Sequence, residues 1–364
     1  MTPSFFHEES RSLAQRLRLA PLAAPEALYR AAVSLRARLY RAGRLRVVRA
    51  GLPVISVGNL AVGGAGKTPV AIYLASRLLE RGFRPAVLSR GYGRKGRGEI
   101  VVADGERVLA SAEEGGDEPV LIARRCPGTL VLVGSDRARL ARRAAELGAE
   151  ILILDDGFQY LALHRDLDLV VLDGGSPFGN RRLLPRGPLR EPPMALGRAD
   201  LCWISKVDEG RPAEVEEAAR IAESLTGHAP VRSRYRPAGI FRADLTTEVE
   251  RSEWRGARVL LVAGLARPDS FRQTARALGA EIVDEALFPD HHRFSRRELE
   301  EIFARLSRRG ATHVLCTEKD AVRLPSELSG DPRVLVARVE VEVVDGKERI
   351  ESWLDRLAPR RRAA

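Results

Sequence analysis

The sequence is poor in cysteine. Its 364 residues include three cysteines, Cys126, Cys202 and Cys316, which lie far apart and form no C-x-x-C pair. This spacing excludes a disulfide framework and a zinc site built on cysteine pairs, and it is typical of proteins of the reducing cytosol. We therefore expect the three thiols to be small core residues.

Long hydrophobic runs are also missing. No apolar segment reaches the roughly 18 residues that a transmembrane helix needs, and the first residues lack the pattern of a secretory signal peptide. No transmembrane helix is predicted. Aromatic residues make up only 5% of the chain and no recognition motif accompanies them, which argues against a protein that binds nucleic acid.

Lysine is scarce, with five residues in the chain, yet the net charge is +11 because arginine is abundant. A basic chain favours an anionic partner, such as a phosphorylated substrate or an acidic membrane surface. The content of 45% hydrophobic and 30% charged residues is that of a globular protein.

The expected fold class is α/β: a mostly parallel sheet of the P-loop NTPase type, with a second, smaller α/β domain joined by a hinge. Apolar strand-like runs alternate with amphipathic helix-like runs from about residue 52 to 228, which indicates a sheet covered on both faces. Residues 229–256 break this rhythm and predict a linker, and a second α/β unit follows. The expected parts are an N-terminal segment (1–48), a P-loop core (49–230), a linker (231–256) and a C-terminal domain with a returning tail (257–364).

Residues 26–46 predict a basic amphipathic helix. Leu28, Ala32, Leu35 and Leu39 recur at helical spacing, and arginines surround them. Such a helix can lie in the headgroup region of an anionic membrane. It can equally pack on its own domain as a surface helix, and the sequence leaves both interpretations open.

Residues 54–70, VISVGNLAVGGAGKTPV, place a glycine-rich turn between an apolar run and an expected helix. They match G-x-x-x-x-G-K-[ST] except that Ala61 stands at the first glycine. The backbone N–H groups of Gly63, Gly64, Ala65 and Gly66 can close on phosphates, Lys67 can reach the β- and γ-phosphates, and the Thr68 hydroxyl can ligate Mg²⁺. We predict that the chain binds a nucleoside triphosphate.

Two further stretches carry carboxylates at points where chemistry is expected. The apolar strand 150–154 runs into Asp155 and Asp156, an arrangement of the Walker B type that holds Mg²⁺, and the sequence does not decide which of the two touches the metal. Asp117 follows Gly115-Gly116 and precedes an expected helix. It fits either a helix cap or a carboxylate presented to an incoming hydroxyl.

Three short motifs are ambiguous. In Phe288-Pro289-Asp290-His291-His292 the adjacent histidines point in different directions, so both cannot face one site. Residues 205–208, SKVD, and 317–320, TEKD, faintly resemble the [NT]-K-x-D pattern by which GTPases read guanine. Matches of four residues arise by chance, so this signal carries little.

Together these segments resemble tetraacyldisaccharide 4′-kinase, the lipid A 4′-kinase family of Gram-negative bacteria. The resemblance rests on VGNLAVGGAGKTPV, LSRGYGRK (88–95), GDEP (116–119), LDDGFQY (154–160), LLPRGPLRE (183–191), FPDHHRF (288–294) and TEKD, all in the family's order. The N-terminal LYRAAVSLRARLYRAG also looks like that family's membrane-associated start. The resemblance spans nearly the whole chain.

The resemblance implies transfer of the ATP γ-phosphate, with Mg²⁺, to the 4′-hydroxyl of a tetraacyldisaccharide 1-phosphate. It implies that Asp117 takes the hydroxyl proton with support from His291. It also implies that Lys67 neutralises phosphate charge and that Glu191 is a further carboxylate on the metal side. Arg90, Tyr92 and Arg137 are expected to contact phosphate or substrate. Because Asp117 and His291 are expected in different domains, domain closure is expected to assemble the site and exclude water.

The same resemblance implies a peripheral, monotopic enzyme on the cytoplasmic face of the inner membrane, with a lipid substrate, no nucleic acid and no obligatory protein partner. Two rivals remain open. One is a GTPase or ATP-driven metallochaperone of the P-loop class, which SKVD and TEKD would suit. The other is a non-catalytic membrane or nucleic-acid binding module, which only the net charge favours.

Overall fold

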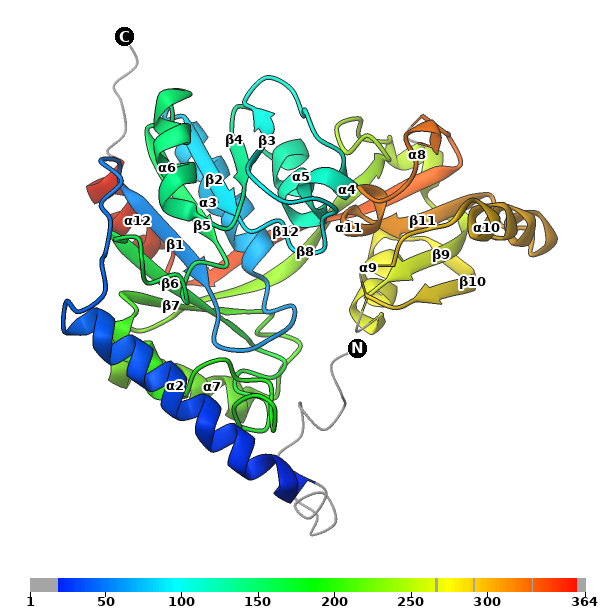
Figure 1. Ribbon diagram of the computed structural model, residues 1–364. Coiled ribbons are helices and arrows are strands. Elements are labelled where there is room, and N and C mark those ends of the chain that lie inside the picture. The colour runs from blue at the N-terminus through cyan, green and yellow to red at the C-terminus, as the bar shows by residue number, and fades with distance from the viewer. Residues whose placement is uncertain (1–18, 266–267, 291, 329, 359–364) are drawn as a thin grey trace. The chain divides into compact units, whose positions relative to one another are not determined.

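The computed structural model describes residues 19–265, 268–290, 292–328 and 330–358, which form two compact units (Figure 1). We call the first the P-loop unit; it comprises residues 19–90, 128–234 and 341–358. The second unit comprises residues 91–127 and 235–340.

The P-loop unit alternates strands with helices, as its hydrophobic periodicity predicts. Its elements are η2 (Ala20–Leu22), α2 (Ala23–Arg41), β1 (Val54–Gly58), α3 (Lys67–Glu80), β2 (Pro85–Ser89), β4 (Leu130–Val133), α6 (Arg137–Glu146), β5 (Ile151–Asp155), β6 (Leu167–Asp173), η3 (Pro193–Arg198), β7 (Leu201–Ser205), α7 (Pro212–Thr226) and α12 (Lys347–Leu357).

The strands of this unit pair in the order β7-β6-β1-β5-β2-β4, and each of these pairings for which register is defined is parallel. Strands β1, β2, β4, β5 and β7 are buried along their whole length, as parallel strands covered on both faces must be. The crossover from β1 to β2 and that from β4 to β5 run in opposite directions across the sheet. The right-handed crossover rule therefore puts α3 and α6 on opposite faces. The expected mostly parallel α/β architecture is confirmed.

The second unit is also of the α/β type. Its elements are β3 (Ile100–Asp104), α4 (Ala112–Gly115), α5 (Asp117–Arg125), α8 (Arg251–Trp254), β9 (Arg258–Gly264), α9 (Asp269–Leu278), β10 (Glu281–Phe288), α10 (Arg296–Arg308), β11 (His313–Thr317), α11 (Glu318–Ala321) and η4 (Ser326–Leu328). Strands β10, β9, β11 and β12 follow one another in parallel pairs. A buried cluster that includes Trp254, Leu261, Phe271 and Leu315 forms the core of this unit.

Two long strands, β8 (Val231–Arg242) and β12 (Val334–Asp345), contribute residues to both units. The expectation of a linker at 231–256 is therefore wrong for residues 231–242, which form a strand. The units also divide the chain differently from the expected domains. Residues 91–127, which carry Asp117, group with residues 235–340, and the C-terminal helix α12 groups with the P-loop unit.

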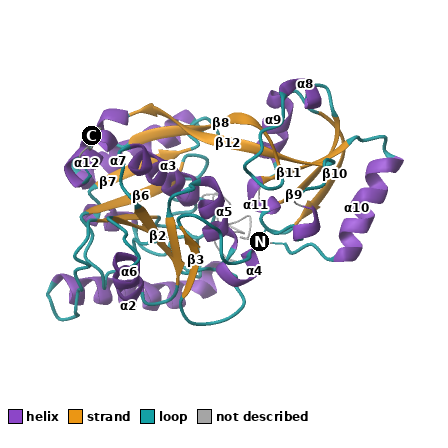
Figure 2. Cartoon of the chain, turned by 90° about the horizontal axis from the view of Figure 1, so that it is seen from above, coloured by secondary structure: helices purple, strands orange, loops and turns teal. Residues whose placement is uncertain are grey.

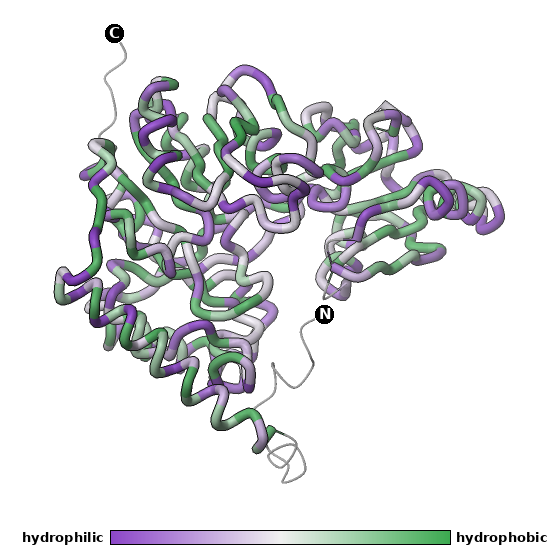
Figure 3. Tube along the Cα trace, in the orientation of Figure 1, coloured by the Kyte–Doolittle hydropathy of each residue, from purple (hydrophilic) through white to green (hydrophobic). Residues whose placement is uncertain are grey.

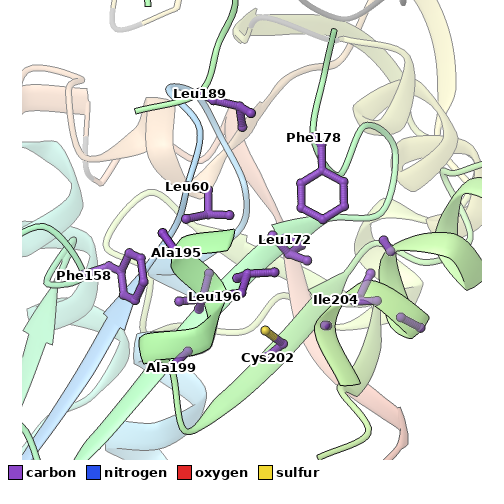
Figure 4. Close-up of a cluster of buried hydrophobic side chains, with 14 of the residues drawn as sticks. Leu60, Phe158, Leu172, Phe178, Leu189, Ala195, Leu196, Ala199, Cys202 and Ile204 are labelled. Carbon is purple, nitrogen blue, oxygen red and sulfur yellow. The ribbon is translucent and has the colours of Figure 1, made fainter. Parts of the chain in front are cut away.

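A buried cluster in the P-loop unit fixes the segments that flank the glycine-rich turn. Figure 4 shows Leu60, Leu172 and Leu196 gathered in it, together with Leu189 from the segment LLPRGPLRE (183–191). Cys202 belongs to the same cluster, and Cys126, Cys202 and Cys316 are all buried free thiols, which confirms their expected place in the core. Burial raises the pKa of Cys202 to about 12, so this thiol is inert at neutral pH.

Helix α2 exposes two of its leucines and packs other side chains on its own unit. Leu28 and Leu35 are 67% and 58% exposed, whereas Tyr29 packs against the buried cluster and Glu26 is buried. Figure 3 shows the hydrophobic and hydrophilic residues alternating along this helix. Leu28 and Leu35 thus do not pack on the same unit, whereas Tyr29 and Glu26 do, and both the membrane and the surface-helix interpretations stay predictions. No helix among the described residues is long and apolar enough to cross a membrane.

Ion pairs join the returning helix α12 to α3, the helix that follows the glycine-rich turn. Both helices are labelled in Figure 2. Arg81, whose side chain is 1% exposed, bonds Glu351 at 2.5 Å and Asp355 at 3.0 Å, and Arg77 bonds Glu351 at 2.9 Å. Removing one partner of a buried ion pair is costly because the other keeps its desolvated charge.

We expect Arg81→Met to destabilise the protein, because Glu351 would stay half-buried with one cation fewer. We expect a loss of about 2 kcal/mol, less than the roughly 3–5 kcal/mol for fully buried pairs, because Glu351 and Asp355 are partly exposed. This loss corresponds to a fall of several degrees in the thermal unfolding midpoint. The matched control is Arg349→Met on the same helix, whose partners Asp345 and Glu348 are exposed, and its midpoint should fall by less. Equal midpoints for the two variants would contradict the assignment.

Candidate active site

The glycine-rich turn forms a cradle between the end of β1 and the start of α3. Gly66 occupies the N-cap of α3 with φ 87°, a left-handed conformation that glycine adopts without strain. Lys67 and Thr68 are the first helical residues, so their side chains and the free N–H groups lie at the positive end of the helix dipole. At the end of β1, a Cβ on Gly58 would collide with Phe158. The segment therefore has the geometry expected of a phosphate-binding loop.

Residues at the ends of two other strands brace this loop. Ser205, the last residue of β7, donates a hydrogen bond to the Ala65 carbonyl at 2.7 Å, and Lys206 donates to the Gly64 carbonyl at 3.0 Å. Lys206 also pairs at 3.0 Å with Asp173, the last residue of β6. Sequence reasoning saw SKVD only as a faint guanine motif and missed this role, because the contact joins residues 142 positions apart.

The two aspartates after β5 face different partners. Asp155 is buried and accepts a hydrogen bond from Ser89 at 3.1 Å. Asp156 has φ 55° and turns its carboxylate toward cations: Lys67 at 3.4 Å and Arg190 at 2.8 Å. The parallel register pairs Val57 of β1 with Asp155, which brings the loop and both carboxylates to the carboxyl edge of the sheet, where parallel α/β sheets bind ligands.

The electrostatics of Asp156 favour its ionised form. Burial acts to raise the pKa of its carboxyl, but Lys67 and Arg190 outweigh burial and the net pKa is lowered. Arg190 thus joins the candidate site, and sequence reasoning had not singled it out. Its position in LLPRGPLRE was the available signal.

Glu191 lies in the same unit but is engaged by protein donors. Its two oxygens accept hydrogen bonds from Arg198 at 2.8 and 3.0 Å, and one also accepts from Gln159 at 3.1 Å. Arg198 in turn stacks over the Phe158 ring at 4.4 Å. The role of Glu191 on the metal side therefore stays a prediction.

The donor set beside the loop suits Mg²⁺. No group of three or more His, Cys, Asp or Glu side chains within the described ranges is arranged to hold a metal. Mg²⁺ does not require one, because it is commonly bound through one or two carboxylates, substrate phosphates and water. The Thr68 hydroxyl and the buried carboxylate of Asp155 supply hard oxygen ligands of this kind.

Asp117 belongs to the second unit, where it is the first residue of α5. Gly116 occupies the N-cap, so the helix-cap interpretation of Asp117 is wrong. Its Oδ2 accepts a hydrogen bond from Arg323 Nε at 2.6 Å. The carboxylate is 15% exposed, whereas the Arg323 side chain is 2% exposed.

The histidine segment belongs to the second unit as well. His291 lies outside the described residues. His292 stacks on Phe288 with ring centroids 4.6 Å apart and bonds Glu298 at 3.0 Å, so it acts in local packing. Asp117 and the flanking residues Asp290 and His292 belong to one unit rather than to two domains. The expected domain closure was based on Asp117 and His291 lying in different domains, and the two units do not divide the chain in that way.

The remaining candidates differ in burial. Arg137 opens α6 and is buried; it donates to the Gly134 and Ser135 carbonyls at 3.2 and 3.1 Å. Burial lowers the pKa of its guanidinium, and the charges of Asp155 and Asp156 act in the opposite direction, which places Arg137 in the field of the aspartate pair. Arg90 and Tyr92 are exposed, and their contacts with substrate stay predictions.

A family model described as Tetraacyldisaccharide-1-P 4'-kinase matches residues 16–358. The chain belongs to this family. The resemblance carried by the sequence motifs is thereby confirmed over nearly the whole chain.

Relatives agree in sequence and in structure. The Tetraacyldisaccharide 4'-kinase of Anaeromyxobacter sp. (strain Fw109-5) is 53% identical and aligns over 93% of this chain and 91% of its own length. That of Syntrophus aciditrophicus (strain SB) is 44% identical, over 81% and 82%. The crystal structure of "apo" form LpxK from Aquifex aeolicus in complex with ATP is 32% identical, has a TM-score of 0.77, and aligns over 93% of this chain and 99% of its own.

We expect Lys206→Met to weaken ATP binding to this kinase, because the Gly64 carbonyl and Asp173 would lose the ammonium that fixes the loop. Loss of a hydrogen bond to a charged group costs about 1.5–3 kcal/mol, so the dissociation constant should rise by roughly tenfold or more. Isothermal titration calorimetry with Mg·ATP measures it. The control is Lys347→Met, an exposed lysine at the start of α12. Unchanged affinity in Lys206→Met would contradict the bracing role.

Proposed function

We propose that this chain transfers the γ-phosphate of ATP to the 4′-hydroxyl of a tetraacyldisaccharide 1-phosphate, a step of lipid A biosynthesis. The observation that carries the proposal is the braced phosphate cradle of residues 63–68 in a chain of the tetraacyldisaccharide-1-P 4'-kinase family. Family membership supplies the substrate class, and the cradle accounts for the nucleotide.

On the phosphate side, the backbone of Gly63, Gly64, Ala65 and Gly66 surrounds the nucleotide phosphates. Lys67 exchanges its contact with Asp156 for the β- and γ-phosphates, and Arg190 adds a second cation beside it. Phosphoryl transfer passes through a loose transition state with charge on the equatorial oxygens, so positioned cations are the main source of catalysis.

Thr68 and Asp155 are the residues that would hold Mg²⁺, with Asp156 and Glu191 as the further carboxylates on that side. Bound there, Mg²⁺ supplies neutralisation of phosphate charge. The ion pair of Asp156 with Lys67 and Arg190 supports Asp155 as the more direct ligand of the pair.

On the acceptor side, Asp117 takes the proton of the 4′-hydroxyl. The hydroxyl oxygen then forms a bond to the γ-phosphorus, while the bond between that phosphorus and the leaving oxygen of ADP breaks. His291 supports Asp117 by hydrogen bonding. The support for Asp117 is a partly exposed carboxylate at the start of a helix, held by a buried arginine, which is an arrangement suited to general base catalysis.

A GTPase or metallochaperone of the P-loop class is the rival function. Its motifs have other uses in this chain: Lys206 of SKVD braces the loop, and Lys319 of TEKD pairs with Asp290 at 3.1 Å. These contacts weaken the argument for guanine recognition.

The membrane surface is the second part of the proposal. The exposed Leu28 and Leu35 of α2 rest in the headgroup region while Arg30, Arg38 and Arg41, all exposed, meet anionic lipids. A groove along the same helix is lined by Ala27, Ala31 and Leu35 together with Arg30 and Arg38. The enzyme thus works as a peripheral protein of the inner membrane's cytoplasmic face, and no obligatory protein partner is expected.

The reaction is tested with γ-labelled Mg·ATP and tetraacyldisaccharide 1-phosphate in detergent micelles, read by thin-layer chromatography. We expect a labelled lipid that depends on the acceptor, and strong competition by unlabelled ATP but not by GTP. Asp117→Asn should lower turnover by roughly 10²–10⁴-fold, the usual contribution of a general base, with ATP affinity retained. Nucleotide hydrolysis without lipid labelling would favour the rival.

Membrane association is tested by sedimentation with phosphatidylglycerol-containing vesicles. We expect Leu28→Glu and Leu35→Glu each to weaken binding about tenfold, because burying one leucine side chain contributes roughly 1.5–3 kcal/mol. The matched control is Leu109→Glu, which changes a leucine of the second unit that is 54% exposed. If all three variants bound vesicles alike, α2 would not be the membrane contact.

A further inference from the structure

The TEKD motif of the second unit is left unexplained by nucleotide recognition, and its side chains account for it in another way. Thr317 ends β11 and caps the short helix α11, and the residues that follow reach three other segments of the same unit. We call residues 317–323 the α11 segment.

The first contact holds the start of α5. Arg323 donates through Nε to Asp117 Oδ2 at 2.6 Å and through Nη1 to Asp320 Oδ1 at 3.3 Å. Asp320 is fully buried and is itself fixed, because it accepts from the Gly264 N–H at 3.0 Å and from the Thr317 hydroxyl at 2.6 Å. Asp320 thus fixes the Arg323 guanidinium, which in turn bonds the carboxylate of Asp117.

The second contact holds the end of the same helix. Glu318 accepts two hydrogen bonds from Arg125, the last residue of α5, at 2.7 and 2.9 Å, and a third from Arg338 at 2.9 Å. The α11 segment therefore bonds α5 at both ends. These bonds fix the position of the helix and of Asp117, its first residue.

The third contact reaches the histidine segment. Lys319 donates to Asp290 at 3.1 Å, and Asp290 directly precedes His291 in the chain. One short segment thus contacts the carboxylate proposed as the base and the residue next to its proposed partner.

Arg323 has further donor capacity. Its Nη2 is buried and has no hydrogen-bond partner among the residues that the structure describes. A buried donor without a partner is costly, and arginine is recruited to a buried site chiefly where its planar fork must fix an anion in one orientation. Pairing one carboxylate oxygen restricts rotation of the group, so the other oxygen is presented in a single direction.

We propose that Arg323, fixed by Asp320, is a positioning residue that orients the Asp117 carboxylate for proton transfer from the acceptor hydroxyl. The inference rests on the proposed function, because it assumes that Asp117 is the base. A cation beside a base also makes it a weaker proton acceptor. Orientation outweighs this cost in a loose transition state, which demands little proton transfer but strict alignment.

The experiment measures steady-state kinetics of lipid phosphorylation for Arg323→Gln, Arg323→Lys and Asp117→Asn, and for the double variant of Arg323→Gln with Asp117→Asn. We expect Arg323→Gln to lower kcat by roughly 10–100-fold, the scale of a misaligned catalytic group, with the KM for ATP within about twofold. Arg323→Lys should recover part of the loss, since it restores a cation. In the Asp117→Asn background, Arg323→Gln should cause no further loss, because residues that act as a unit are non-additive.

Controls separate the outcomes. Arg333→Gln removes an exposed arginine of the same unit that pairs with Asp331 and stacks over Phe303, and should leave kcat unchanged. If Arg323→Gln is poorly folded, judged by its thermal midpoint, Asp320→Asn combined with Arg323→Gln removes the buried carboxylate that the loss would strand, and the same kcat effect is expected.

Wild-type turnover in Arg323→Gln with an inactive Asp117→Asn would overturn the positioning role and leave the base assignment standing. So would a full additional loss in the double variant, because Arg323 would then act independently of Asp117. Wild-type turnover in Asp117→Asn would overturn both the base assignment and the inference that rests on it.

Discussion

The parallel pairing of β1 with β5 is the constraint on which the phosphate site depends. It sets Val57 opposite Asp155, so the glycine-rich loop that leaves β1 and the aspartates that follow β5 emerge at the same edge of the sheet. Asp173 and Ser205 end the next strands at that edge, and both reach the loop or its brace. A one-residue slip of β5 against β1 would turn the side chains of β5, that of Asp155 among them, to the other face of the sheet. The buried strands on both sides make such a slip very costly.

The order of elements and the main helices could be predicted from the sequence, because fully buried strands and amphipathic helices leave strong periodic signals. Strand β8 could not. It alternates poorly, contains Pro237 and carries arginines whose partners lie on β12, such as Arg234 with Glu342 at 2.8 Å. A strand that buries side chains only near its two ends and carries exposed, ion-paired arginines between them has the composition of a linker. Strand β3 was missed because five residues between glycine-rich turns give too short a signal.

The residues of the candidate site also fall into two groups, those that the sequence reveals and those that it does not. Residues whose chemistry depends on local geometry, Gly63 to Thr68 and the aspartate pair, could be found from spacing alone. Lys206, Arg190 and Arg323 could not, because each acts through a contact between residues distant in sequence: Arg323 and Asp117 are 206 positions apart. Asp117 itself shows the limit of local reasoning. Its sequence context suits a helix cap, but Gly116 takes that position and leaves the carboxylate for Arg323.

The abundant arginines have a structural role that the net charge of the chain does not reveal. Arg81, Arg190, Arg198 and Arg323 are each paired with carboxylates at buried or half-buried positions, where the planar guanidinium can satisfy two oxygens at once and a lysine could not. Arg81, Arg198 and Arg323 therefore contribute to architecture and not to an anion-attracting surface, whereas Arg190 also lies beside Lys67 and Asp156 in the candidate site. Helix α2 differs: it carries exposed arginines around exposed leucines. Its single buried acid, Glu26, accepts hydrogen bonds from the Leu183 N–H at 3.1 Å and Arg186 at 3.3 Å. The residues that bond Glu26 therefore belong to the same loop that carries Arg190, so this loop supports both α2, the proposed membrane contact, and the cation beside Asp156.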